Sequence, residues 1–116
     1  MTQKSFQPIA IVGRGCILPG CSNVSDLWQV LEQGKVEVST AADDDWRVDQ
    51  ARLFEDSKGE FVADKLWSTH GGYVRRFLEQ FDTSQFQLEP DILKQLDPVF
   101  LWSLEAARQA KAELNS

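Results

Sequence analysis

The stretch that decides the fold of this chain is PIAIVGRGCILPG, residues 8–20. Within it, Ile9 to Val12 is a short apolar run rich in β-branched residues and closed by a glycine, which is typical of a β-strand covered on both faces. Three glycines and Pro19 follow, and they predict a tight connection in which φ is fixed at proline or free to be positive at glycine. We therefore expect a buried strand that leads through a turn into a helix.

A helix over residues 24–33 is predicted directly after this connection. Asn23 can cap its first turn, and Asp26 can return a hydrogen bond while facing the positive end of the helix. Gly34 is well suited to the position just after the last turn. The apolar stripe is formed by Leu27, Trp28, Val30 and Leu31. We expect Leu27, Trp28 and Leu31 to pack this helix onto the strand.

A strand, glycines and a helix also occur in dinucleotide-binding turns, where the helix N-terminus faces a phosphate. The spacing differs here, because the glycine after Gly13 and Gly15 comes too late and no Gly-Lys-Ser/Thr follows. A small nucleotide-binding α/β protein is therefore the least favoured of three interpretations; the other two are given below.

Residues 9–20, IAIVGRGCILPG, closely resemble the opening of a β-ketoacyl synthase domain, the condensing enzyme of fatty-acid and polyketide synthases. Further similar elements follow in the family's order: Leu27-Trp28, Gly71-Gly72-Tyr73, Phe81-Asp82 with Phe86, and Asp97-Pro98 leading to Leu104-Glu105-Ala106. The resemblance implies an α/β chain that is the N-terminal part of a thiolase-type layered fold, with one early buried strand plus helices and long loops. Residues 1–116 would be a single partial domain, in which we expect residues 1–7 to be flexible.

Proline marks two helix starts near the end of the chain, at Glu89-Pro90-Asp91 and at Asp97-Pro98. The alanine-rich sequence from Pro98 to Leu114 is helical by propensity, and its apolar first turn predicts burial. Val99-Phe100 departs from the residues usual in modular polyketide enzymes and is more similar to condensing domains of bacterial polyunsaturated-fatty-acid synthases.

Catalysis in the resembled family uses a cysteine nucleophile and two histidines, which the resemblance places beyond Ser116. Cys16, Cys21 and His70 match none of them, so we expect no catalytic, cofactor-binding or metal-binding residue here and no condensing activity from this chain alone. Its partners would be the remainder of the synthase domain and acyl carrier protein, whose phosphopantetheine carries the family's substrate. A self-sufficient, noncatalytic interaction module on the same scaffold is the alternative.

The composition is that of a soluble globular protein, with 42% hydrophobic residues and a formal net charge of −6. Such a charge disfavours nucleic acid and anionic membranes as partners. No signal peptide is recognisable, so we expect a cytoplasmic protein. In a reducing compartment Cys16 and Cys21 should stay unbridged, with Cys16 packed as a small hydrophobe and Cys21 in a loop. Strand edges and apolar side chains that lack the rest of the domain predict self-association.

Several shorter patterns complete the expectations. Asp43-Asp44-Asp45 lacks the ligand spacing of a calcium loop and predicts a solvated turn. Residues 36–40 alternate as in a brief strand, residues 50–65 read as loops with one helical turn, and residues 69–74 predict a turn entering a strand. Asp82 should cap a short turn between Phe81 and Phe86, and His70 should lie in a loop without a catalytic role.

Overall fold

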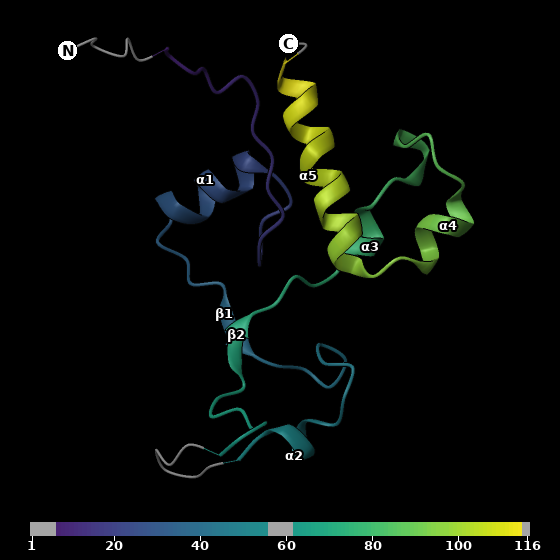
Figure 1. Ribbon diagram of the computed structural model, residues 1–116. Helices are drawn as coiled ribbons and strands as arrows, with labels where there is room; N and C mark the ends of the chain where they lie inside the picture. The colour runs from purple at the N-terminus through teal and green to yellow at the C-terminus, as the bar shows by residue number, and fades with distance from the viewer. Residues whose placement is uncertain (1–6, 56–61, 115–116) are drawn as a thin grey trace, which may run out of the picture.

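A computed structural model of the chain describes residues 7–55 and 62–114 (Figure 1). The expectation of a flexible N-terminus concerns residues that, except for Gln7, lie outside this described part. The elements in chain order are α1 (Val24–Glu32), β1 (Val38–Thr40), α2 (Gln50–Leu53), β2 (His70–Gly72), α3 (Phe77–Gln80), a 3-10 turn (Thr83–Gln85), α4 (Pro90–Gln95) and α5 (Pro98–Leu114).

The N-terminal segment, residues 7–17, has no sheet partner and is not a β-strand, so the expectation of a buried strand at Ile9–Val12 is wrong for this chain. Ile9 and Ile11 are 88% and 86% exposed. The physical reason is the absence of neighbours: β1 and β2 pair only with each other, and no other described strand lies beside residues 9–12. A strand needs such a ladder to satisfy its backbone groups.

Helix α1 forms where the sequence predicts it and is capped as expected. The side chain of Asn23 accepts a hydrogen bond from the backbone N–H of Asp26, and Gly34 has a φ of 61°. The N–H groups of Gly34 and Lys35 donate to carbonyls of the last turn, which completes a Schellman cap. The predicted packing is wrong, because Trp28 and Leu31 are 63% and 64% exposed and have no covered strand to pack on.

The small sheet is an antiparallel ribbon in which Val38 pairs with Gly72 and Thr40 with His70. Its first strand lies within the predicted segment 36–40. The second strand differs from the prediction, because His70, Gly71 and Gly72 form the strand themselves instead of a turn before it. Glycines are tolerated in this strand because each strand of the ribbon pairs with one other strand only and most of its residues are exposed.

Helices α4 and α5 both begin at the predicted prolines. Pro90 is in the first turn of α4, and the carboxylate of Asp97 accepts the backbone N–H of Val99 at the start of α5. The sequence predicted a buried first turn for α5. Leu101 is buried as predicted, whereas Val99 and Phe100 are exposed. The aromatic rings of Phe77, Phe81 and Phe86 stack in sequence, with centroids 5.1 Å apart in each pair.

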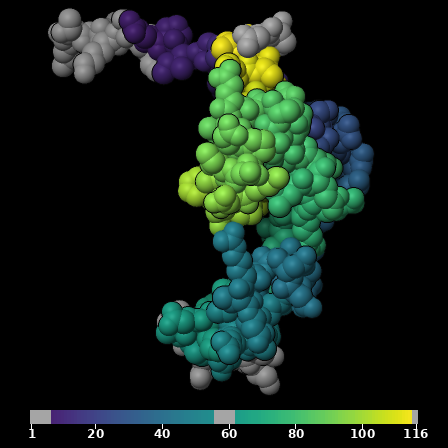
Figure 2. All heavy atoms as spheres, turned by 90° about the vertical axis from the view of Figure 1, so that its right-hand side faces the viewer, coloured from purple at the N-terminus to yellow at the C-terminus, as the bar shows by residue number. Residues whose placement is uncertain are grey.

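The buried apolar side chains of the described residues are Cys21, Leu93 and Leu101, of which Leu93 is fully buried. The radius of gyration is 19.4 Å, whereas a compact domain of this length has about 13 Å. The large radius reflects an extended shape, because the blue-to-teal part of the chain lies as a separate lobe below the rest (Figure 2). The chain therefore has little core of its own, and its helices offer faces without a covering layer.

Candidate functional site

The N-terminal segment lies against α5, antiparallel to it (Figure 1). A Cβ on Gly13 would clash with the carbonyl oxygen of Ala110, and one on Gly15 with that of Ala106. Positive φ values occur among the described glycines at Gly20 and Gly34, not at these two. Gly13 and Gly15 are therefore needed for close approach of two backbones, and not for the turn conformation that the sequence suggested.

Two side chains of α5 accept hydrogen bonds from the backbone of this segment. The N–H of Arg14 donates to Oε2 of Glu113 over 2.9 Å, and the N–H of Cys16 donates to Oε1 of Gln109 over 3.2 Å. The guanidinium of Arg14 also pairs with Glu113 at 3.2 Å. These hydrogen bonds from Arg14 hold the pKa of the Glu113 carboxyl below its ordinary value.

A polar network continues one turn further along α5. The side-chain amide of Gln109 donates to the carbonyl of Ser22 over 2.8 Å and to Glu105 over 3.1 Å. Arg108 donates two hydrogen bonds to the Glu105 carboxylate, at 2.8 and 2.7 Å, and these lower the pKa of that carboxyl. Through Gln109, α5 therefore fixes both Cys16 and the loop that precedes α1.

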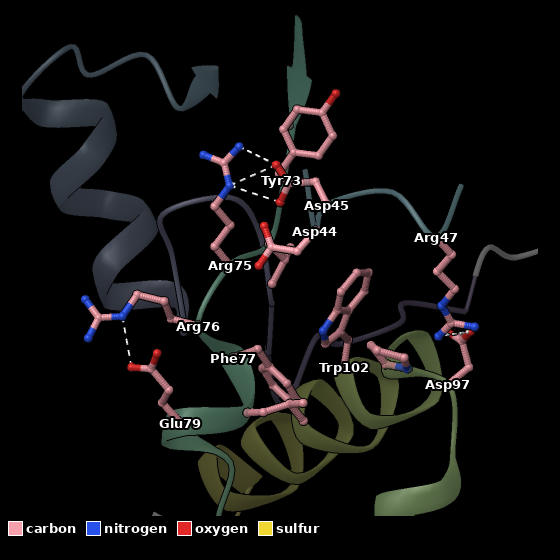
Figure 3. A pocket seen from close by; sticks show the side chains of 14 residues that line it. Asp44, Asp45, Arg47, Tyr73, Arg75, Arg76, Phe77, Glu79, Asp97 and Trp102 are labelled. Carbon is pink, nitrogen blue, oxygen red and sulfur yellow. Dashed lines mark hydrogen bonds and ion pairs between the residues drawn. The ribbon is translucent and has the colours of Figure 1, made fainter. Parts of the chain in front are cut away.

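A second cluster is centred on Arg75 (Figure 3). Its guanidinium donates to both carboxylate oxygens of Asp45, to Oγ of Ser39 over 3.0 Å and to the carbonyl of Thr40 over 2.9 Å. It also lies 5.2 Å from the ring centre of Tyr73. Hydrogen bonding to Arg75 holds the pKa of the Asp45 carboxyl below its ordinary value. Arg75 thus joins the acidic turn to the β1–β2 ribbon.

Beside this cluster is an open hollow of about 670 Å³. Its three arginines each pair with a carboxylate: Arg47 with Asp97, Arg75 with Asp45, and Arg76 with Glu79. The positive charges of the wall are therefore balanced, as Figure 3 shows for these pairs. Trp102 also lines the hollow, and its buried indole nitrogen has no hydrogen-bond acceptor among the residues that the structure describes.

The structure shows the surroundings of His70, Cys16 and Cys21, for which the sequence predicted no catalytic role. His70 lies on β2, not in a loop, and its recorded side-chain partner is Oγ1 of Thr40 at 3.4 Å. Both cysteines are free thiols. Cys21 lies in a loop as expected, in a tight turn closed by backbone hydrogen bonds with Leu18, and it is buried there. Cys16 is half-buried. Burial raises the pKa of both thiols.

The acidic turn is less solvated than predicted, because the side chain of Asp45 is only 8% exposed. It accepts the backbone N–H of Ala42 as well as the hydrogen bonds of Arg75. Within residues 7–55 and 62–114, no three histidine, cysteine or carboxylate side chains are grouped so that they could hold a metal ion. Over the same residues, no helix has the length and apolar character needed to cross a membrane.

Sequence reasoning missed the residues that hold these clusters together. Arg75 is not part of a recognisable motif, although it lies two residues after Gly71-Gly72-Tyr73. Gln109 and Glu113 look like ordinary solvated positions of a helix, and only their spacing of four residues hints at one common face. Arg76, with a φ of 60°, is the N-cap residue of helix α3 (Phe77–Gln80), which the sequence did not predict.

A family model described as "Beta-ketoacyl synthase, N-terminal domain" matches residues 6–114. The exposed helix faces of this chain are those expected for one part of a larger layered fold. The family match identifies the domain to which that part belongs. The chain belongs to the β-ketoacyl synthase family, in its N-terminal domain.

Several large synthases contain a similar stretch. The highly reducing polyketide synthase g433 of Fusarium sp is 35% identical over 104 residues, which are 88% of this chain and 4% of that protein. The non-reducing polyketide synthase stbA of Stachybotrys bisbyi is 33% identical over 95 residues, 78% of this chain and 4% of that protein. The chain spans at most 6% of the curated relatives reported.

A solved structure, "PfaC Keto synthase-Chain length factor", superposes on 90% of this chain and 11% of its own chain, with a TM-score of 0.75 and 34% sequence identity. This match confirms the expected fold class, the N-terminal part of a ketosynthase of the thiolase type. Residues 9–12 are nevertheless not paired as a strand in this chain.

Proposed function

We propose that this chain is the structural N-terminal part of a β-ketoacyl-[acyl carrier protein] synthase that acts in fatty-acid or polyketide chain elongation. The observation that carries the proposal is the N-terminal segment: Ile9–Val12 is apolar on both faces, exposed, and without backbone pairing. Such a segment is suited to a sheet whose other strands come from further polypeptide.

The family match supports a role as part of a larger domain. The relatives are synthases many times longer than this stretch, which covers 4% of each of two of them. The same stretch covers 11% of the PfaC chain that superposes on it. Residues 1–116 then act as a single partial domain, whose strand, helices and loops form one wall of the synthase subunit.

We further propose that the chain alone is inert in condensation. A cysteine acyl-enzyme requires a thiol of depressed pKa together with donors for the oxyanion. Burial raises the pKa of Cys16 and Cys21 instead. Chemistry would depend on the cysteine and two histidines of the complete domain, acting on substrates carried by the phosphopantetheine of acyl carrier protein.

The similarity to PfaC supports a synthase of the polyunsaturated-fatty-acid type as the parent. We also propose a cytoplasmic location. The net charge of −6 disfavours nucleic acid and anionic membranes as partners.

Two measurements test the proposal. In the first, the isolated chain is incubated with acyl-loaded and malonyl-loaded carrier protein, and we expect no condensation product above a protein-free blank. Product formed by this chain alone would overturn the proposed inertness.

The second measurement uses a chimera in which residues 7–114 replace the equivalent stretch of the PfaC ketosynthase chain. We expect the chimera to fold, to melt cooperatively and to keep the activity of the parent within about tenfold, a change of about 1.4 kcal/mol in the barrier. A matched chimera with Ile9→Asp and Ile11→Asp should fail to assemble, because charges would enter a covered strand. A chimera that tolerates both aspartates would contradict the proposed role of the segment.

A further inference from the structure

Residues 38–55 and 62–75 form the lobe around the β1–β2 ribbon that lies below the helices (Figure 2). This lobe is held together by contacts of its own. The backbone N–H of Ala41 donates to the carbonyl of Thr69 over 2.9 Å, and the phenol of Tyr73 donates to the same carbonyl over 2.8 Å. The links between the lobe and the helices therefore decide how firmly the lobe is placed.

Arg75 and Arg76 are consecutive residues whose side chains bind on opposite sides of the boundary between the lobe and the helices. The guanidinium of Arg75 binds Asp45 and the β1–β2 ribbon, within the lobe. The guanidinium of Arg76 binds Glu79 of α3, with 2.9 Å between Nε and Oε2. The boundary between the two units therefore falls at the backbone that joins these arginines.

The backbone of Arg76 is strained at this boundary. Its φ of 60° lies in the left-handed region, which a residue with a side chain adopts at a cost. Its carbonyl accepts the N–H of Glu79, on the α3 side. Its own N–H has no hydrogen bond recorded among the described residues. Rotation about φ at Arg76 therefore releases strain without breaking a backbone hydrogen bond of this residue.

An ion pair joins the lobe to the start of α5. Nη2 of Arg47 lies 2.7 Å from Oδ2 of Asp97, and the two side chains are 74% and 41% exposed. Among the described residues, this is the one recorded hydrogen bond or ion pair that crosses from the lobe to the rest of the chain. An exposed pair shifts an equilibrium by about 1.4-fold to fivefold, and the strain of a left-handed residue amounts to about fivefold upward. The lobe is therefore held only weakly.

The open hollow of about 670 Å³ lies where the lobe meets α5. Its wall combines Asp45 and Arg47 of the acidic turn with Trp102 of α5 (Figure 3). The buried indole N–H of Trp102 has no acceptor among the residues that the structure describes, and burial of an unpaired donor is unfavourable. Movement of the lobe away from α5 gives water access to this donor.

We propose that the chain has a hinge between Arg75 and Arg76, and that the ion pair of Arg47 with Asp97 is a salt-sensitive latch that holds the lobe over Trp102. Opening releases the strained φ of Arg76 and hydrates the indole N–H, whereas closure gains the ion pair. The hinge is independent of the proposed function, because all of these contacts lie within the chain.

Single-molecule energy transfer in the 116-residue chain tests the latch at picomolar concentration, where copies do not associate. Dyes on noncanonical residues at the exposed Ala63 and Ala107 span the hinge and leave both native cysteines in place. We expect a closed and an open population. Salt at about 1 M, which screens charges beyond about 3 Å, should raise the ratio of open to closed chains by about 1.4-fold to fivefold, and so should Arg47→Ala.

Arg52→Ala is the matched control for the latch, because it removes an equal charge from an exposed residue of the same lobe outside the latch. It should leave the ratio of open to closed chains unchanged. A ratio that neither salt nor Arg47→Ala changes would overturn the latch. An equal change in Arg47→Ala and Arg52→Ala would also overturn it.

Arg76→Pro tests the position of the hinge, because proline fixes φ at about −65° and excludes the observed value. The closed population should disappear. Arg76→Ala loses the pair with Glu79 but permits the same φ, so it should keep the ratio of the parent chain. A second dye pair at the exposed Ser25 and Ala107 lies within the helical part and should show the same transfer in every variant. Equal ratios in Arg76→Pro and Arg76→Ala would overturn the hinge, and so would an equal change in the second dye pair.

Discussion

At the scale of single residues, this chain is held by a few polar contacts where a larger core is absent. Arg75 binds three groups, those of Ser39, Thr40 and Asp45. Gln109 binds Cys16, Ser22 and Glu105. Each contact lies at the surface or only half-buried, so each contributes modestly by itself. Their value lies in fixing loops relative to α5 and to the β1–β2 ribbon.

Gly13→Ala should lower the free energy of unfolding by about 1–3 kcal/mol, because the new methyl group meets a backbone carbonyl that cannot turn away. Urea unfolding at one low protein concentration, followed by far-ultraviolet circular dichroism, measures the change. Gly71→Ala is the matched control: its Cβ would lie 3.1 Å from the phenol oxygen of Tyr73, which can move. Equal losses in the two variants would argue against the close contact with α5.

The pair of Asp45 and Arg75 predicts a loss of structure in acid. Because the pKa of Asp45 is lowered in the folded chain, its contribution is complete above the unfolded value of about 3.9 and is lost as the pH falls through the lower folded value. The Nε–H signal of Arg75 in NMR spectra should persist at pH 4 and broaden below it. In Asp45→Asn this signal should be weak at every pH, whereas Asp43→Asn, at an exposed neighbour, should behave like the parent chain.

At the scale of elements, helices are the part that the sequence predicts well. Caps and prolines act within a few residues, so Asn23, Gly34, Pro90 and Pro98 mark helix ends without knowledge of the rest of the fold. The segment Ile9–Val12 has the composition of a strand, yet strand pairing depends on partners distant in sequence. This is why the sequence predicted the fold class correctly and the pairing of residues 9–12 in this chain wrongly.

Helix α1 depends on its cap because little of it is buried. Asn23→Ala should cost about 0.5–2 kcal/mol and reduce helicity at residues 24–26. Carbon chemical shifts of α1 report this directly. Ser25→Ala changes an exposed position in the first turn of the helix and should leave the shifts of α1 close to those of the parent. Similar fraying in both variants would mean that the cap contributes nothing.

The candidate clusters were harder to foresee than the elements. Arg75 and Asp45 are 30 residues apart in sequence, and Arg14 and Glu113 are 99 apart. Neither pair is spaced as a local motif, so only the packing of the chain brings them together. The glycines of residues 13 and 15 carried a usable signal, but the sequence alone could not distinguish a turn from a close approach of two backbones.

At the scale of the whole molecule, the chain is expanded and has a small core. Its radius of gyration of 19.4 Å exceeds the value of about 13 Å for a compact domain of this length. Exposed large side chains occur on the N-terminal segment, on α1 and at the start of α5. Each would gain about 1.5–3 kcal/mol on burial, so a few of them compare with the stability of a whole domain of about 5–15 kcal/mol.

The central claim is that this chain needs further ketosynthase polypeptide to complete its fold. Sedimentation of the isolated chain over a range of concentrations, together with thermal melting of the same samples, tests it most directly. We predict association that grows with concentration, or a broad melt at low temperature. A monomer at every concentration that melts cooperatively at high temperature would contradict the claim and favour a self-sufficient module.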